Sequence, residues 1–226
     1  MMLTRRLIER AALLMGLLLL AGCATPKRYD YSSFRESRPA SILVLPPVNR
    51  SPDVGATYSV LSHATLPLAE SGYYVFPVTL VDETFKQNGM TTPADIHQVP
   101  AGKLREIFGA DAALYIQVKQ YGTTYAIIVS ETRVTADARL VDLRSGKTLW
   151  EGSATASSGE GDSSTGGGVV GLLVKAVVSQ IVDTVSNRGH AIAGMATQRL
   201  LAAGRPNAIL YGPRSPRYLR DGSPTP

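Results

Sequence analysis

Residues 113–157 alternate between apolar and polar side chains, which is typical of β-strands that bury one face. The pattern is clearest where Val134, Ala136, Ala138 and Leu140 face one way and Arg133, Thr135, Asp137 and Arg139 face the other. A helix would scatter these two sets around its axis, because its side chains repeat every 3.6 residues. We therefore predict three strands, over residues 113–121, 127–143 and 147–157.

The turn between the last two predicted strands decides which residues face each other. A two-residue loop at Ser145-Gly146 would place Leu140 opposite Glu151. A three-residue loop, with Gly146 in the left-handed conformation, places Leu140 opposite Trp150 and keeps apolar residues together. We predict the longer loop, because a slip of one residue exchanges the two faces of a strand. It also pairs Arg139 with Glu151, Ala138 with Gly152 and Ala136 with Ala154.

The first half of the chain has the pattern of a parallel sheet with helical crossovers. Apolar runs at residues 41–45 and 73–76 each end at a proline and predict buried strands. Helices are predicted between and after them, over residues 56–71, 79–88 and 101–108. Strand, helix and strand in this order indicate a parallel pair. The predicted fold class is α/β, a mixed β-sheet flanked by helices.

The C-terminal part contains an apolar helical pattern. Residues 157–168 are rich in glycine and serine and predict a flexible link. A helix is expected after it, ending at Gly189, and a second from His190 to Ala203. The wide apolar face of the first must be covered by the sheet, by a second subunit or by lipid. This candidate self-association face consists of Val170, Leu173, Val174, Val177, Val178, Ile181 and Val185.

The chain has one cysteine, Cys23, directly after a short apolar segment. Three arginines lie in the first ten residues, and the apolar segment runs from Ala11 to Ala21. A stable membrane span needs about 20 apolar residues, so this segment is too short. A basic start, a short apolar core and small residues at its end are typical of a secretory signal. We predict a signal peptide over residues 1–22.

The sequence Leu20-Ala21-Gly22-Cys23 resembles the bacterial lipobox, where a precursor is acylated on cysteine and cut before it. The resemblance implies that Cys23 carries lipid, palmitate included. Ala24 follows, and by resemblance to the sorting rules of enteric bacteria this favours the outer membrane. We expect an outer-membrane anchor facing the periplasm, with exposure at the cell surface as the alternative. A lipidated Cys23 leaves no thiol for a disulfide, so a hydrophobic core must stabilise the protein.

The remaining sequence divides into three parts. Residues 23–40 are expected to form the lipidated cysteine and a tether, because Ala24–Ala40 is polar and has no periodicity. As a flexible coil such a tether averages about 23 Å. Residues 41–204 are expected to form a single α/β domain. Residues 205–226 form a basic, proline-rich tail that we expect to be extended and solvated, with contact to anionic head groups or a partner as the alternative.

The net charge of +5 does not indicate binding to nucleic acid. Residues 1–22 contribute +2, which leaves with the signal peptide, and residues 205–226 contribute +3. The segment between them, residues 24–204, holds 16 basic and 16 acidic residues. No basic face of the kind that nucleic acids require is visible, so we expect no nucleic-acid partner.

No motif in the sequence is typical of catalysis or of metal binding. His63, His97 and His190 are far apart, and none has a second ligand three or four residues away. The glycine-rich stretch at 159–168 lacks the phosphate-loop pattern. No GxSxG motif is present. We expect no catalytic residues, no metal, no cofactor and no enzymatic activity, with an enzyme of an unrecognised kind as the alternative class.

Two stretches carry a family resemblance: ILVLPPVNRSPDVGATYSVLSHATLPLAESGYYVFPV and ARLVDLRSGKTLWEGSATAS. They resemble a family of bacterial outer-membrane lipoproteins without an assigned function, which includes a meningococcal surface-antigen candidate. The strand and helix order is also similar to the TolB amino-terminal domain, to the curli-secretion lipoprotein CsgG and to the cell-wall-synthase activator LpoB. The resemblance implies a TolB-like mixed sheet and a role in binding other envelope proteins.

We expect a non-enzymatic adaptor in envelope assembly or secretion. Its expected partners are outer-membrane lipid through Cys23, further copies of the chain and other envelope proteins. The alternatives are an accessory subunit of a CsgG-like secretion pore and an activator of a cell-wall synthase.

Overall fold

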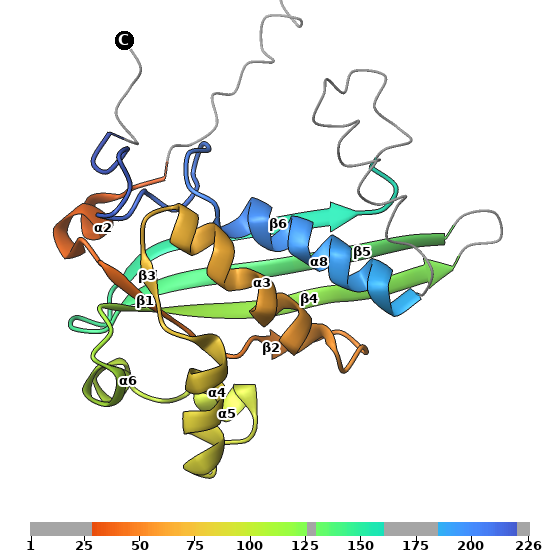
Figure 1. Cartoon of the computed structure of the whole chain (residues 1–226), viewed down its shortest axis with the longest axis horizontal. Coiled ribbons are helices and arrows are strands. Elements are labelled where there is room, and N and C mark those ends of the chain that lie inside the picture. Colours follow the sequence, from red (N-terminus) through yellow and green to blue (C-terminus); the bar gives the residue numbers. More distant parts are fainter. Residues whose placement is uncertain (1–28, 126–129, 161–184, 221–226) are drawn as a thin grey trace, which may run out of the picture.

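A mixed sheet lies at the centre of the structure (Figure 1), a computed structural model that describes residues 29–125, 130–160 and 185–220. In these residues the sheet has six strands in the order β3-β1-β4-β5-β6, and β2 pairs with β4 outside this path. The strands are β1 (Ser41–Val44), β2 (Val48–Asn49), β3 (Tyr74–Val75), β4 (Ala112–Tyr125), β5 (Ser130–Asp142) and β6 (Thr148–Ser157). The predicted α/β class, a mixed sheet flanked by helices, is confirmed.

The first half of the chain forms the parallel part of the sheet. Strand β1 lies between β3 and β4 and is parallel to both. Helix α3 (Ala56–Glu70) makes the crossover to β3, and α4 (Val78–Gln87) and α6 (Ala101–Phe108) follow as predicted. Helix α6 ends at Gly109, whose φ of 70° is left-handed. Strand β2 and helix α5 (Pro93–Ile96) were not predicted, because elements this short show no periodicity.

The second half of the chain forms a long antiparallel hairpin system with the predicted register. Leu140 faces Trp150 and Arg139 faces Glu151, as predicted, but beside the turn Val141 pairs with Thr148, so the loop is one residue longer than predicted and a bulge at Leu149 restores the register. Gly146 has a φ of 70°, which is the left-handed conformation assigned to it. The two-residue loop is wrong, and the hydrophobic pattern predicted the register of the strands but neither the bulge nor the longer loop.

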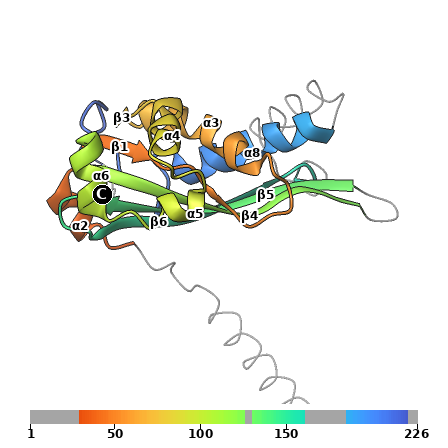
Figure 2. The same cartoon turned by 90° about the horizontal axis from the view of Figure 1, so that it is seen from below.

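Helices α3 and α8 (Val185–Leu201) cover one face of the sheet, as Figure 2 shows. The even-numbered residues of β5, those of β4 up to Val118, and Tyr121 beyond the β4 bulge point into this layer. There they meet Val60, Leu61 and Leu68 of α3 and Ile192 and Ala196 of α8. Helix α8 runs through Gly189, so the prediction that this glycine ends a helix is wrong. A Cβ on Gly189 would lie 3.0 Å from the ring of Tyr121. The glycine lets α8 approach β4 closely.

The opposite face of the sheet is covered over only part of its area. Helices α4, α5 and α6 pack a second, smaller core against Leu43 and Leu45 of β1, with Val81, Phe85, Ile96 and Leu104 as its largest helical members. In the described residues this core reaches β4 only at Ala113 and Tyr115. On this face β5 is apolar at Val141, beside Ala113, while Asp137 and Arg139 of β5 and Glu151 and Ser153 of β6 present polar side chains.

Residues 29–40 fold against the sheet, which corrects the expected tether. They form helix α2 (Ser32–Ser37), and its Phe34 is only 4% exposed within the main core. Arg38 closes this helix in the left-handed conformation, and Tyr31 donates a hydrogen bond of 2.5 Å to the carbonyl of Ala208. The tether was predicted from the polar composition of this segment. Its three aromatic residues are nevertheless enough to pack it against the domain.

Residues 205–220 also fold against the domain, which corrects the expected extended tail. Ile209 and Leu210 are buried, and the hydroxyl of Tyr73 donates a 2.5 Å hydrogen bond to the carbonyl of Leu210. Further along, the amide of Gly212 donates to the carbonyl of Ser71 at 2.8 Å. The folded unit thus extends beyond the expected 41–204 in both directions.

Strand β6 is an edge strand, and side chains occupy parts of its outer edge. Arg199 of α8 donates a 2.8 Å hydrogen bond to the carbonyl of Thr155, and the Glu160 carboxylate accepts one from the amide of Ser157 at 2.9 Å. Arg199 and Glu160 also bind each other at 2.5 and 2.8 Å. The edge is therefore capped at its end. Among the described helices, none has the length and apolarity that a membrane crossing requires.

Candidate functional site

The uncovered face of β4, β5 and β6 contains an open groove. Its volume is about 710 Å³, and its floor is the sheet itself. One wall is formed by β2 and α5, and the other side is open along β6. The side chains that line it are mostly polar and include Arg50, His97, Gln98, Tyr115, Gln117, Asp137, Arg139, Glu151 and Ser153.

The end of the groove beside α5 is an aromatic and cationic stack. The Nε2–H of His97 donates a hydrogen bond of 2.9 Å to the carbonyl of Pro46, and its ring meets the ring of Tyr115 edge-on at 5.2 Å. The guanidinium of Arg139 lies 5.2 Å from the centre of the same tyrosine ring. Burial, together with the charge of Arg139, lowers the pKa of His97. The neutral imidazole is favoured, and it positions Tyr115 without adding charge.

The middle of the groove carries charges of both signs. Lys119, the bulged residue of β4, forms an ion pair with Asp137 of β5. The second carboxylate oxygen of Asp137, Oδ1, is shielded from solvent and accepts no hydrogen bond from the described residues. Glu151 lies opposite Arg139 on the neighbouring strand. The surface thus presents fixed donors and acceptors to whatever lies across it.

The lining of the groove offers polar and charged side chains for binding. No side chain that lines the groove is a serine or cysteine held by a base, and His97 is engaged with a backbone carbonyl. In the part of the chain that the structure describes, no three His, Cys, Asp or Glu residues are grouped so that they could hold a metal ion. A wide, open and charged groove matches an extended polar segment of another macromolecule.

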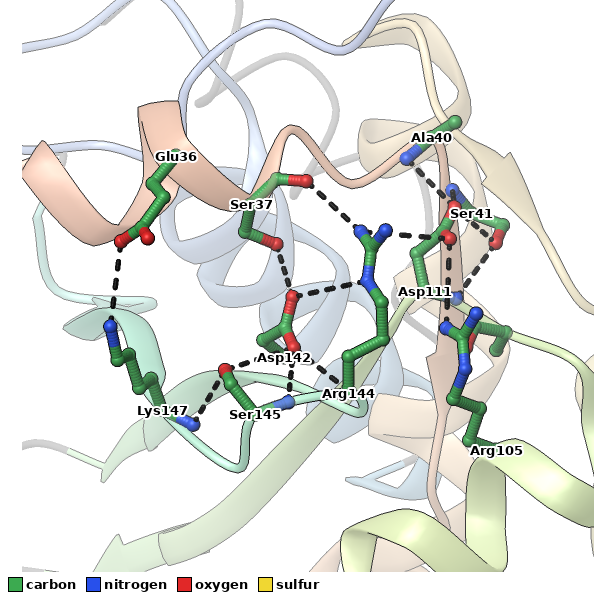
Figure 3. A network of polar contacts seen from close by, with 11 residues as sticks. Glu36, Ser37, Ala40, Ser41, Arg105, Asp111, Asp142, Arg144, Ser145 and Lys147 are labelled. Atoms are coloured by element: carbon green, nitrogen blue, oxygen red, sulfur yellow. Dashed lines mark hydrogen bonds and ion pairs between the residues drawn. The ribbon is translucent and has the colours of Figure 1, made fainter.

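A polar network holds the N-terminal segment to the sheet (Figure 3). The Oδ2 atom of Asp111 accepts three hydrogen bonds, from the amides of Ala40 and Ser41 at 3.1 Å and from the Ser41 hydroxyl at 3.0 Å. Arg105 and Arg144 each lie 4.0 Å from the other oxygen. The carboxylate therefore fixes the start of β1, where the chain enters the sheet.

Asp142, at the end of β5, holds α2 and the following turn together (Figure 3). Its Oδ1 accepts hydrogen bonds from the amides of Arg144 and Ser145 at 2.8 and 2.7 Å, and Oδ2 accepts one from the Ser37 hydroxyl. Burial raises the pKa of Asp142, but these hydrogen bonds outweigh burial and leave the pKa below its usual value. The charged form is thus part of the folded structure.

Two of the histidines meet where α3 and α8 cross. The rings of His63 and His190 lie 4.3 Å apart, and the Nε2–H of His63 donates to the carbonyl of His190 at 3.1 Å. The Nδ1 atom of His190 lies 2.9 Å from the hydroxyl of Ser59, which accepts a hydrogen bond from Tyr121. Among the described residues no carboxylate contacts either imidazole, so this Ser–His pair lacks the group that orients a catalytic histidine.

Comparison with known proteins identifies the family of the chain. The family model described as "Putative lipoprotein GNA1162-like" matches residues 29–214. The chain belongs to this family. The matched residues coincide closely with the folded unit, including α2 and the C-terminal segment that sequence patterns had placed outside the domain.

Members of the family from Neisseria meningitidis are similar over most of their length. The "Putative lipoprotein NMB1124/NMB1162" of N. meningitidis serogroup B is 52% identical over 203 residues, which are 89% of this chain and 94% of that protein. The crystal structure of lipoprotein GNA1162 from N. meningitidis is 58% identical, covers 63% of this chain and 98% of that chain, and has a TM-score of 0.53. The resemblance found in the sequence is confirmed.

More distant solved structures share less sequence identity with this chain and have lower TM-scores. The C-terminal domain of LpoB from Salmonella enterica is 17% identical and covers 52% of this chain and 82% of that chain, with a TM-score of 0.37. Similarity at this distance indicates nothing about function.

The site residues that the sequence predicted lie almost entirely outside the described residues. This holds for the signal peptide and Cys23, and for the self-association face from Val170 to Ile181. Val185 begins the described part of α8. The groove and the histidine pair were not predicted, because both join residues from distant parts of the sequence. The alternation that put Arg133, Thr135, Asp137 and Arg139 on one face was the signal for the groove's floor.

Proposed function

We propose that this family member is a non-enzymatic adaptor, anchored to the outer membrane through Cys23 and facing the periplasm. It binds another envelope protein through the groove on the open face of its sheet. The observation that carries the proposal is the uncovered polar surface of β4–β6, with charges of both signs held in place by the strands. Membership in a lipoprotein family supports the anchor.

The groove favours a protein partner over a small molecule. Small-molecule pockets are mostly apolar and enclose their ligand. Here the floor is flat sheet, and Arg139, Asp137 and Glu151 stand along it as separate charges. Such a pattern selects a partner with the complementary order of charges and repels others.

The proposed adaptor acts close to the membrane. Tyr29 is the first residue that the structure describes, and six Cα-to-Cα steps separate it from Cys23. Fully extended, such a segment spans at most about 20 Å. A reach this short argues against the alternative of a cell-wall-synthase activator, which needs a long leader to cross the periplasm.

Site-specific crosslinking in living cells tests the groove. A photoreactive amino acid replaces Ser153, which is exposed at the groove's open side, and in a matched control it replaces Leu66, which is 62% exposed on α3. We expect a covalent adduct with one envelope protein from position 153 and none from position 66. Equal labelling at both positions, or no adduct at 153, would contradict the proposal.

Charge reversal sharpens that test. Arg139→Glu reverses the charge that a partner meets at this point of the groove and adds a carboxylate beside Glu151, so the adduct should fall at least tenfold. Lys103→Glu on α6 makes the same change in charge away from the groove and should leave the adduct unchanged.

The anchor is tested separately by Cys23→Ser. The full-length variant should appear in the soluble periplasmic fraction after a wash in high salt, whereas the wild type stays with the outer membrane. A variant that still fractionates with the outer membrane in high salt would remove the anchor from the proposal and leave the groove to be judged by crosslinking.

A further inference from the structure

We propose that a basic surface formed by α2 and the C-terminal segment lies flat against anionic lipid head groups of the membrane that holds the anchor. This inference rests on the lipid anchor of the proposed function. The surface, here called the arginine surface, consists of Arg35, Arg38, Arg214, Arg217 and Arg220, all of which are exposed.

The two segments that form this surface are far apart in sequence and adjacent in space. Phe34, Arg35 and Arg38 line one side of a small hollow, and Leu210, Tyr211, Tyr218 and Leu219 line the other. The C-terminal segment is fixed there by the Gly212–Ser71 hydrogen bond and by one of 3.1 Å from the amide of Arg214 to the carbonyl of Gly72. The arginines therefore project from a folded platform.

Aromatic rings hold two of the arginines in place. Arg217 donates a hydrogen bond of 2.9 Å to the hydroxyl of Tyr211, and its guanidinium lies 5.6 Å from the centre of that ring. The guanidinium of Arg214 lies 5.5 Å from the centre of the Tyr74 ring. A guanidinium stacked in this way keeps donors free for phosphate oxygens.

The balance of charge around the arginine surface is strongly positive. Residues 29–38 and 211–220 contain five arginines and two carboxylates, Asp30 and Glu36. Glu36 is engaged with Lys147 of the neighbouring turn at 3.4 Å. Lys27 and Arg28 directly precede residues 29–38 in the sequence and Asp221 directly follows Arg220, so these neighbours together add one positive charge. Elsewhere in the mature chain basic and acidic residues nearly cancel.

An apolar side chain accompanies the charges. Leu219 is 58% exposed, and its φ of 62° is one that side-chain-bearing residues rarely adopt. It lies between the half-exposed Tyr218 and Arg220. Arginines with a neighbouring tyrosine and leucine are the combination that favours the boundary between head groups and acyl chains.

The anchor places this surface within reach of the bilayer. Tyr29, the first described residue, is held to the domain, because its amide donates a 2.9 Å hydrogen bond to the side chain of Asn207. The segment back to Cys23 spans at most about 20 Å when extended. Once the anchor has inserted, the surface needs only a rotation to come within the Debye length of about 8 Å.

Vesicle binding tests the inference without the anchor. The chain from Ala24 onward keeps every described residue, and it is sedimented with vesicles of phosphatidylcholine, with and without phosphatidylglycerol. We expect binding only to the anionic vesicles, and loss of binding as salt is raised. Arg35→Gln with Arg220→Gln should weaken binding about 25-fold, at about fivefold for each basic residue.

A matched double variant controls for total charge. Lys86→Gln with Lys103→Gln removes two charges from helices α4 and α6, outside the groove and the arginine surface, and should weaken binding less than twofold, while thermal unfolding verifies that both double variants fold. Equal binding to neutral vesicles, or equal loss in the two double variants, would overturn the inference. Binding to an acidic polypeptide such as polyglutamate, in the absence of vesicle binding, would also overturn it, by assigning the surface to a protein.

The outcome is distinguishable from failure of the proposed function. Crosslinking from Ser153 reports on the groove, and the Cys23→Ser fractionation reports on the anchor. Either can succeed while the vesicle assay fails, and the vesicle assay can succeed while either of them fails.

Discussion

Trp150 links strand β6 to the C-terminal segment. It is 1% exposed, and its indole N–H donates a 2.9 Å hydrogen bond to the carbonyl of Asn207 in the C-terminal segment. Its ring lies over Gly152 on the same strand, where a Cβ would overlap the ring carbons. Gly152 is therefore required by the tryptophan, and the tryptophan in turn positions the segment that carries the arginine surface.

Replacing Gly152 should therefore destabilise the folded protein. We expect Gly152→Ala to lower the free energy of unfolding by about 1–3 kcal/mol, because the new methyl group forces the indole ring aside. Denaturant unfolding measures the change. Ser153→Ala, at the neighbouring exposed position, is the control and should stay within about 0.5 kcal/mol of the wild type. A Gly152→Ala variant as stable as the control would show that the ring can move freely.

The carboxylate of Asp142 should be equally sensitive. Asp142→Ala leaves the amides of Arg144 and Ser145 and the hydroxyl of Ser37 without their acceptor. A loss of about 1–3 kcal/mol is expected for such unpaired groups. Hydrogen exchange should show faster exchange in α2. Glu106→Ala removes an exposed helical ion pair with Lys103 and should cost less than about 1 kcal/mol. Unchanged protection of α2 would mean that its aromatic contacts alone hold it.

Between elements, the contact of α3 with α8 depends on small residues and paired histidines. A Cβ on Gly194 would lie 3.1 Å from the ring of His63, so this glycine lets the two helices approach. Burial lowers the pKa of His63, and the nearby His190 lowers it further, against a smaller opposing effect of the hydrogen bond to the His190 carbonyl. Folding therefore favours the neutral form of His63 relative to the unfolded chain.

The difference in the pKa of His63 between the folded and the unfolded chain predicts that acid weakens the contact between α3 and α8. The unfolded state binds the proton more tightly, so the contribution of His63 is complete above its unfolded pKa of about 6.5 and is lost as the pH falls below that value. His97, whose pKa is also lowered, acts in the same direction. We expect the loss of stability between about pH 7.5 and about pH 5.5 to be smaller in His63→Gln than in the wild type.

Denaturant midpoints at the two pH values measure this effect. The matched variant His97→Gln should remove only the part of the pH-dependent loss of stability that arises from His97 in the groove. If the His63→Gln variant loses as much stability on acidification as the wild type, the helix contact is not the pH-sensitive element.

The success of the sequence predictions differed from element to element for physical reasons. The register of β5 with β6 followed from alternation, because a slip would have put charges into the core. The continuation of α8 through Gly189 did not, because glycine is enriched at helix ends and only the nearby Tyr121 ring explains it here. The groove could not be predicted either, since it exists only where α4, α5 and α6 fail to cover the sheet.

At the scale of the whole molecule, the two ends of the chain were the least predictable parts. Tyr29, Tyr31 and Phe34 form an aromatic chain, with ring centres 5.0 and 6.4 Å apart, that docks a segment of polar composition. Residues 208–210 return to the same end of the domain and complete its core. Neither segment has periodicity, so its position depends on contacts across nearly the whole length of the sequence.

Self-association through the apolar pattern of residues 170–185 remains a prediction. Val174→Asp with Val178→Asp places two charges on that face and should convert the associated species to monomer, because an apolar interface does not tolerate unpaired carboxylates. Sedimentation velocity of the chain from Ala24 onward measures this. Ser179→Asp, on the polar row of the same pattern, is the control and should leave association intact. A monomeric wild type would remove self-association from the proposed function.

The capped edge of β6 gains importance from the confinement that a lipid anchor would impose. Proteins held in one plane with a common orientation meet each other far more often than in free solution, and an open strand edge would invite them to polymerise. Arg199 and Glu160 occupy the backbone groups at the end of that edge, which shortens the stretch where a neighbour's strand could add. Removing Arg199 and Glu160 would therefore promote filaments of anchored molecules before it destabilised the fold of any one of them.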